Sequence, residues 1–117
     1  MRIKVSVTVK QPGGEGRYEA PFLLETGVFD SMAPAAALRS AGIRPVGSRT
    51  YRLGDGSWKE FLFALVRIEF VGEITAGRII FGPDDAEPFL GVTALEAAGV
   101  SIDPSTQTLR KLPAVRL

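Results

Sequence analysis

The sequence predicts one small domain built mainly of β-strands, with one or two short helices. Apolar and polar residues alternate in several stretches, as in 3–9, and glycine-containing turns separate these stretches. Helix-forming residues gather in only two short segments, 34–41 and 92–98. At 117 residues the chain is long enough for one hydrophobic core, so we expect a single domain over residues 1–117.

Turn signals divide the chain into successive strands. The glycine-rich segment 11–16, the segment Gly54–Ser57 and the pair Val71–Gly72 each join two strand-like runs. Asp55 followed by Gly56 is a strong hairpin signal. Strands are expected over residues 3–9, 17–24, 49–53, 58–70, 74–81, 89–91, 100–102 and 108–112.

The first helix is expected after the second strand. Asp30 or Ser31 is a suitable N-cap, and Pro34 suits the first turn of the helix. Three alanines and a leucine follow, and Gly42 is expected to end the helix. This helix is short, so a structural role is expected for it.

The composition narrows the chemistry open to the chain. It contains no cysteine and no histidine, which excludes disulfides, thiol nucleophiles, Cys/His zinc sites and imidazole bases. Any general acid or base must therefore be a carboxylate, a lysine or a tyrosine. The acidic segment 84–87 lacks EF-hand spacing and is expected to be a solvated loop. We expect no metal and no cofactor.

Charge and hydropathy argue against nucleic-acid and membrane partners. The formal net charge is +1, and the basic run from Arg39 to Arg52 is expected to be a solvated rim rather than a phosphate site. No helix with Lys-Ser/Thr follows the glycines of 11–16, which argues against a phosphate loop. The N-terminal residues alternate in polarity and no 18-residue apolar stretch occurs, so a cytoplasmic location is expected.

A carboxylate at the end of an apolar strand is the starting point for a functional interpretation. The apolar run 22–24 leads into Glu25, Thr26 and Gly27. Taken alone, this tripeptide is typical of an ordinary turn, since all three are common turn residues. Further along, the segment 88–91 repeats the step from apolar strand to glycine and opens a second short helix.

This order of segments resembles the retropepsin-like aspartic peptidases, most of all the small single-domain versions of bacteria and archaea. In that family an apolar strand runs into Asp-Thr/Ser-Gly-Ala. A glycine-containing flap hairpin follows, and then two apolar residues and a glycine precede a helix. The matching segments here are 23–28, 54–56 and 89–92, with a further match over 99–104. The resemblance covers about residues 3–112.

The resemblance implies a retropepsin-like closed β-barrel, the acid-protease half-fold, with a flap hairpin over the site. It implies a homodimer acting on peptide or protein substrates, with Glu25 in the catalytic position facing Glu25 of a second copy. Thr26 and Gly27 would support the active-site loop. The N-terminal strand and residues 109–117 would lie at the dimer interface. The residues implied to contact substrate are Val28, Asp30, Leu53, Asp55, Gly56, Trp58 and Leu90.

For the hairpin, the alternative is an ordinary surface turn with Trp58 buried in the core. For the whole chain, the alternative is an unrelated small β-barrel in which Glu25 caps a turn.

The main departure from the family is Glu25, because the family carries aspartate there. Glutamate keeps the charge but moves the carboxyl group outward by one methylene, about 1.5 Å. Three interpretations stay open: an active glutamate variant, a peptide-binding or dimerisation module without turnover, and a chain altered at this position to an inactive form.

Overall fold

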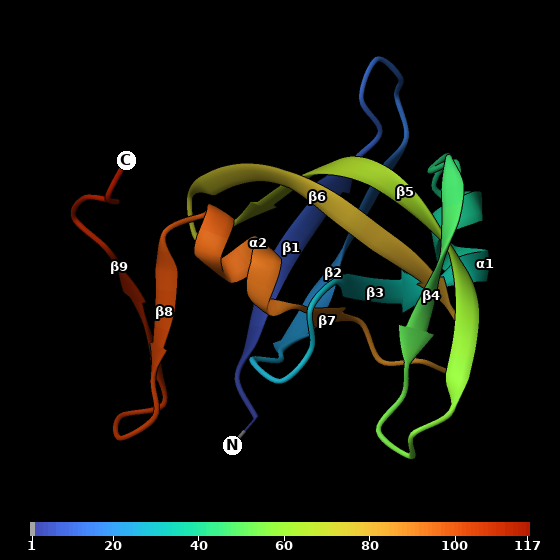
Figure 1. The fold of residues 1–117 in the computed structure, drawn as a ribbon. Helices are drawn as coiled ribbons and strands as arrows, with labels where there is room; N and C mark the ends of the chain where they lie inside the picture. Colours follow the sequence, from blue (N-terminus) through green and yellow to red (C-terminus); the bar gives the residue numbers. More distant parts are fainter. Residues whose placement is uncertain (1) are drawn as a thin grey trace.

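Nine strands and two short helices make up residues 2–117, the part of the chain that the computed structural model describes (Figure 1). The elements are β1 (Lys4–Lys10), β2 (Arg17–Leu24), β3 (Ser31–Pro34), α1 (Ala35–Ser40), β4 (Gly47–Arg52), β5 (Trp58–Phe70), β6 (Glu73–Gly82), β7 (Phe89–Leu90), α2 (Val92–Ala97), β8 (Val100–Asp103) and β9 (Thr108–Lys111). The prediction of a mainly β fold with short helices is confirmed. Within residues 2–117 neither helix has the length or hydropathy to cross a membrane.

Seven of the strands form one sheet, in the order β1-β2-β7-β3-β6-β5-β4. Strand β5 also pairs with β1, with Val7 opposite Phe70, so the pairings return to the first strand. Strand β4 pairs with β5 and lies outside this ring of strand pairings. Strands β8 and β9 form a separate two-stranded sheet. In Figure 1 the β8–β9 pair stands on the side of the molecule away from β4.

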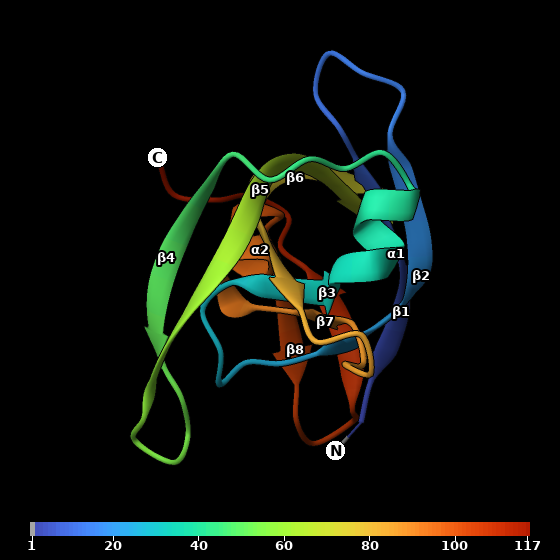
Figure 2. The same cartoon turned by 90° about the vertical axis from the view of Figure 1, so that its right-hand side faces the viewer.

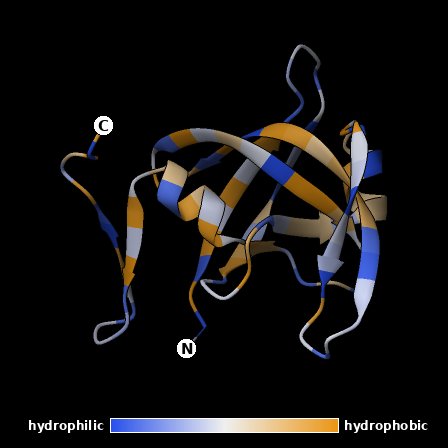
Figure 3. Cartoon of the chain, viewed as in Figure 1, coloured by the Kyte–Doolittle hydropathy of each residue, from blue (hydrophilic) through white to orange (hydrophobic). Residues whose placement is uncertain are grey.

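The core lies inside the ring because the long strands alternate in side-chain direction. In β5, Ala64, Val66 and Ile68 are buried, whereas Leu65 and Arg67 between them are exposed. The helices add buried leucines from α1 and α2. Figure 3 shows apolar colouring along much of β5 and β6, while β4 and the neighbouring end of β5 are mostly white and blue.

Two hairpins extend from opposite ends of the molecule. In Figures 1 and 2 the turn between β1 and β2 rises at the top, and the β4–β5 hairpin reaches the bottom. The predicted turns at 11–16, Gly54–Ser57 and Val71–Gly72 all connect antiparallel strands, as expected.

The predicted start of the first helix is wrong. Residues Ser31–Pro34 form strand β3, which pairs with β6 and, through Met32, with β7. Helix α1 begins at Ala35, and its N-cap residue Pro34 offers no side-chain acceptor. The Asp84 carboxylate accepts the N–H of Ala36 in the first turn instead, at 3.0 Å. Neither Asp30 nor Ser31 acts as an N-cap, because both are engaged in contacts with distant segments.

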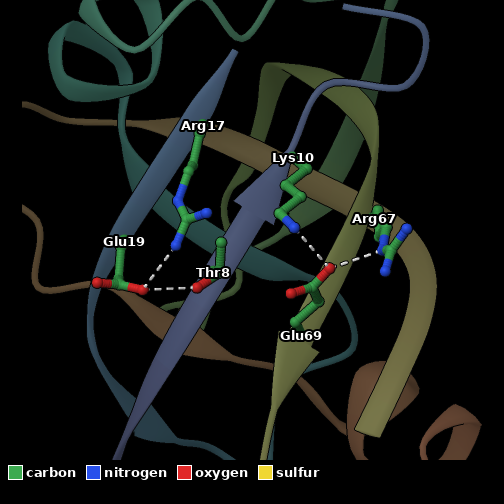
Figure 4. Close-up of polar contacts among 6 residues, drawn as sticks. All are labelled: Thr8, Lys10, Arg17, Glu19, Arg67 and Glu69. Atoms are coloured by element: carbon green, nitrogen blue, oxygen red, sulfur yellow. Dashed lines mark hydrogen bonds and ion pairs between the residues drawn. The ribbon is translucent and has the colours of Figure 1, made fainter. Parts of the chain in front are cut away.

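A line of polar contacts crosses the outside of β1, β2 and β5 (Figure 4). The Glu69 carboxylate lies 3.1 Å from the Lys10 ammonium and 2.7 Å from the Arg67 guanidinium. The Thr8 hydroxyl donates to Glu19 at 2.8 Å. The Lys10–Glu69 ion pair therefore bridges β1 and β5, the pairing that returns the sheet to its first strand.

The pH dependence of stability tests the Lys10–Glu69 ion pair. Hydrogen bonding from Lys10, and then the charges of Lys10 and Arg67, hold the pKa of Glu69 below its ordinary value of 4.5. A lowered folded-state pKa stabilises the fold above pH 4.5, and this stabilisation is lost as the pH falls through the folded-state pKa. We expect the urea midpoint to fall less steeply for Glu69→Gln than for the wild type between about pH 5 and 3.

The matched control is Glu96→Gln, which removes an exposed glutamate with no ion pair among residues 2–117. It should leave the wild-type slope unchanged. Equal slopes for all three proteins would show that the bridge adds nothing to stability.

Candidate functional site

Glu25 directly follows strand β2, in a loop that strand β7 holds in place. The two strands run parallel, with Leu24 beside Leu90. The N–H of Glu25 then donates to the carbonyl oxygen of Leu90 at 2.9 Å, so the pairing continues one residue into the loop. The Glu25 side chain is half-buried, and within residues 2–117 its carboxylate forms no hydrogen bond or ion pair. Its carboxylate is thus left available to a ligand.

The start of α2 holds the rest of this loop. The N–H of Val92 donates to the Val28 carbonyl oxygen at 2.8 Å. The N–H and the hydroxyl of Thr93 both donate to the Phe29 carbonyl oxygen, at 3.2 and 2.9 Å. Irregular backbone needs such partners, because unpaired carbonyl and N–H groups are costly when buried. The residues at the start of α2, which follow the second strand-to-glycine segment, therefore hold the Glu25 loop in place.

Gly91 lets these two segments approach closely. Its N–H donates to the Ser31 hydroxyl oxygen at 3.0 Å in a buried contact. A Cβ atom at Gly91 would lie 2.5 Å from the Phe29 carbonyl oxygen and 2.7 Å from main-chain atoms of Asp30. A glycine is required here by the space available, since its φ of −85° suits any residue.

A groove of about 320 Å³ lies between this loop and the β4–β5 hairpin. Most of its lining side chains are apolar or aromatic, as expected of a ligand site. The lining residues are Gly27, Val28, Phe29, Asp30, Met32, Tyr51, Arg52, Leu53, Phe61, Ile80 and Phe89.

Asp30 and Tyr51 connect the two walls of the groove. The Tyr51 hydroxyl in β4 donates to the Asp30 carboxylate at 2.5 Å, and Asp30 is only 4% exposed. Burial, followed by the hydrogen bond and charge of Asp30, raises the pKa of Tyr51 well above its ordinary value of 10.0. The Tyr51 ring also packs edge-on against Phe61, with centroids 6.2 Å apart. A neutral phenol therefore ties the hairpin to the Glu25 loop.

The predicted site residues fall into two groups. Gly27, Val28, Asp30 and Leu53 line the groove. Glu25 and Thr26 come directly before the loop residues that form the groove wall. Glu25 is half-buried and Thr26 is exposed. These residues are brought together, and their roles remain predictions.

The other predicted residues lie away from the groove lining. Asp55 is bound within the hairpin turn, where the Ser57 N–H and hydroxyl donate to it at 2.9 and 2.6 Å. Gly56 supplies the left-handed turn, with a φ of +86°. Trp58 is 67% exposed, so the alternative that buried it in the core is wrong. The Leu90 side chain is fully buried, and its carbonyl group is what meets the Glu25 loop.

The sequence interpretation missed Tyr51 and Phe29. Both line the groove, and Tyr51 forms its one polar cross-link within the described residues. The sequence signal that could have identified Tyr51 is the strand-like pattern of residues 49–52, in which alternate residues share a face, so Tyr51 lies on the same face as Arg49. Which face meets the loop depends on a strand register that the sequence leaves open.

Comparisons with known proteins give no family. No protein-family model matches the chain, and no curated protein matches it. Within residues 2–117, no three acidic side chains gather where they would hold a metal ion.

Substituting Gly91 tests the close approach of the two segments. Gly91→Ala forces its new Cβ against main-chain atoms of the loop, which cannot move aside as a flexible side chain would. We expect a loss of about 1–3 kcal/mol in the free energy of unfolding, measured by urea denaturation. The control Gly54→Ala meets no atom within 4 Å. It should keep or slightly raise stability, and an equal loss in both variants would contradict the close approach.

Removing the Tyr51 hydroxyl tests the cross-link. Tyr51→Phe leaves the buried Asp30 carboxylate without its donor, which should cost about 1–3 kcal/mol in the free energy of unfolding. The matched change Tyr18→Phe removes a hydroxyl with no hydrogen bond to another residue in the 2–117 range. It should change stability by less than about 0.5 kcal/mol. Similar urea midpoints for the two variants would rule out the cross-link as a stabilising contact.

Proposed function

We propose that this chain is a retropepsin-like domain that binds extended peptides in the groove beside Glu25. The observation that carries the proposal is the segment from Gly27 to Asp30, directly after Glu25, which forms one wall of a mostly apolar groove opposite a hairpin. The adjacency of Leu24 and Leu90 supports it, since the resemblance rests on these two strand-to-glycine segments. The ring of strand pairings supports the closed barrel of the acid-protease half-fold.

Hydrolysis by this domain requires two copies. Each chain carries one strand-end carboxylate of this kind, and the reaction needs a pair that shares one proton. One carboxylate takes a proton from water, whose oxygen attacks the peptide carbonyl carbon, while the other protonates the carbonyl oxygen. Collapse of this intermediate breaks the C–N bond, and a proton passes to the leaving amine. The pair therefore titrates as a unit.

The separate β8–β9 sheet supports an interface with a second copy. A two-stranded sheet is weak on its own, and its open edges invite pairing with another chain. Leu112 and Val115 just beyond it are 47% and 66% exposed. We propose that the two copies meet through this segment.

A second candidate is a peptide-binding module without turnover, and Glu25 itself favours it. Compared with aspartate, the longer glutamate side chain moves each carboxyl group of the pair outward by one methylene. A misplacement of about 1 Å can reduce a rate roughly a hundredfold. The groove and its hairpin do not depend on this carboxylate, because Glu25 contributes no side-chain bond within residues 2–117.

Cleavage of a diverse peptide library between about pH 4 and 7 separates the two candidates, because carboxylates titrate in this range. If Glu25 is catalytic, the wild type cuts, Glu25→Gln does not, and the specific activity rises with protein concentration as dimers form. Glu15→Gln, in the exposed turn before β2, is the control and should keep full activity.

Activity restored only by Glu25→Asp would identify the groove as that of a peptidase whose chemistry this chain has lost. Peptide binding with no cleavage by any variant supports the module. No binding and no cleavage would overturn the proposal.

A further inference from the structure

Three basic side chains lie on the groove side of β4, β5 and β6. In the β4–β5 pairing, Tyr51 is opposite Lys59 and Arg49 is opposite Phe61. Opposite residues of an antiparallel pair share one face of the sheet. Because Tyr51 and Phe61 line the groove, Arg49 and Lys59 border it on the same face. Arg78 of β6 extends this basic surface, two residues before the groove residue Ile80.

Aromatic rings hold each of these cations in place. The Arg49 guanidinium lies 5.8 Å from the ring centroids of both Phe29 and Tyr51. The Lys59 ammonium lies 5.1 Å from the Phe61 centroid. Such cation–π contacts orient a charge but do not neutralise it. Arg78 is held in the same way, 5.1 Å from the centroid of Phe63.

None of the three forms an ion pair with a carboxylate within residues 2–117. The cations that do form ion pairs there are Arg2, Lys4, Lys10, Arg17, Arg67 and Lys111. Among the acidic side chains close to the groove and the hairpin, Glu25 forms no ion pair with these cations, and the others are engaged or turned away. Asp30 accepts the Tyr51 hydroxyl, Asp55 is bound by Ser57 in the turn, and Glu60 lies on the other face of β5.

We propose that the groove selects extended peptides that carry an acidic side chain. Apolar side chains of the peptide occupy the groove, and the acidic one lies against Arg49 and Lys59. Charge complementarity carries this assignment, because three cations without ion pairs border a mostly apolar groove. The inference rests on the proposed peptide binding, and it names the class of peptide.

Matched peptides test the selectivity. Three fluorescent peptides share one apolar extended sequence and differ at a single position, which is Glu, Gln or Lys. Binding is followed by fluorescence anisotropy on the wild-type chain. At low salt the Glu peptide should bind about tenfold more tightly than the Gln peptide, and the Lys peptide more weakly still. Near 0.5 M salt this advantage should largely disappear, as exposed charges are screened.

Paired variants locate the effect. Arg49→Gln with Lys59→Gln should remove most of the tenfold advantage, measured as the ratio of the Glu-peptide and Gln-peptide affinities on the same variant. A general change in the groove cancels in this ratio. The control combines Arg39→Gln with Arg44→Gln, two exposed arginines without ion pairs in the described part of the chain. Neither lines the groove nor belongs to the proposed interface, so this variant removes the same charge and should keep the full advantage.

The outcomes separate this inference from the proposed function. Equal affinities for the Glu and Gln peptides would overturn the acidic preference and leave peptide binding standing. An equal loss in the control and the hairpin variant would also overturn it, because overall charge would then explain the effect. No binding of any peptide would overturn both proposals.

Discussion

The attachment of the Glu25 loop to residues 90–93 is the constraint on which the groove depends. The loop has no regular structure, so its carbonyl and N–H groups need partners outside the loop. Strand β7 and the first residues of α2 supply them, and Gly91 leaves the space that they require. One wall of the groove is thus fixed by a segment far away in sequence. The other wall is joined to it by the Tyr51–Asp30 hydrogen bond.

Local sequence signals predicted most of the strands and helices, because residues close together in the sequence determine where those elements form. The hairpins form where glycine-containing turns join alternating strands, and α2 begins at the expected residue. The signal failed at residues 31–34, where a proline and nearby helix formers suggested a helix. Tertiary pairing decided the outcome there: β3 fits between β6 and β7, and local preference is the weaker effect.

The site was predictable only in part, for a related reason. The resemblance drew attention to Glu25 and to the strand around Leu90, and these segments do lie side by side. The contacts of Tyr51, Phe29 and Arg49 depend on which face of β4 meets the loop. A slip of one residue would turn all of these side chains to the other face, and a single sequence does not fix that register.

The pairing of β1 with β5 and of β2 with β7 has a consequence for the order of folding. Val7 meets Phe70 and Leu24 meets Leu90, so both pairings join distant parts of the chain. Such contacts require loop closure before they give any stabilisation, and proteins dominated by them fold in about milliseconds to seconds. On the ribosome the loop with Glu25 emerges long before residues 90–93 do. It stays without these main-chain partners until then, so the groove is among the last features of the domain to take shape.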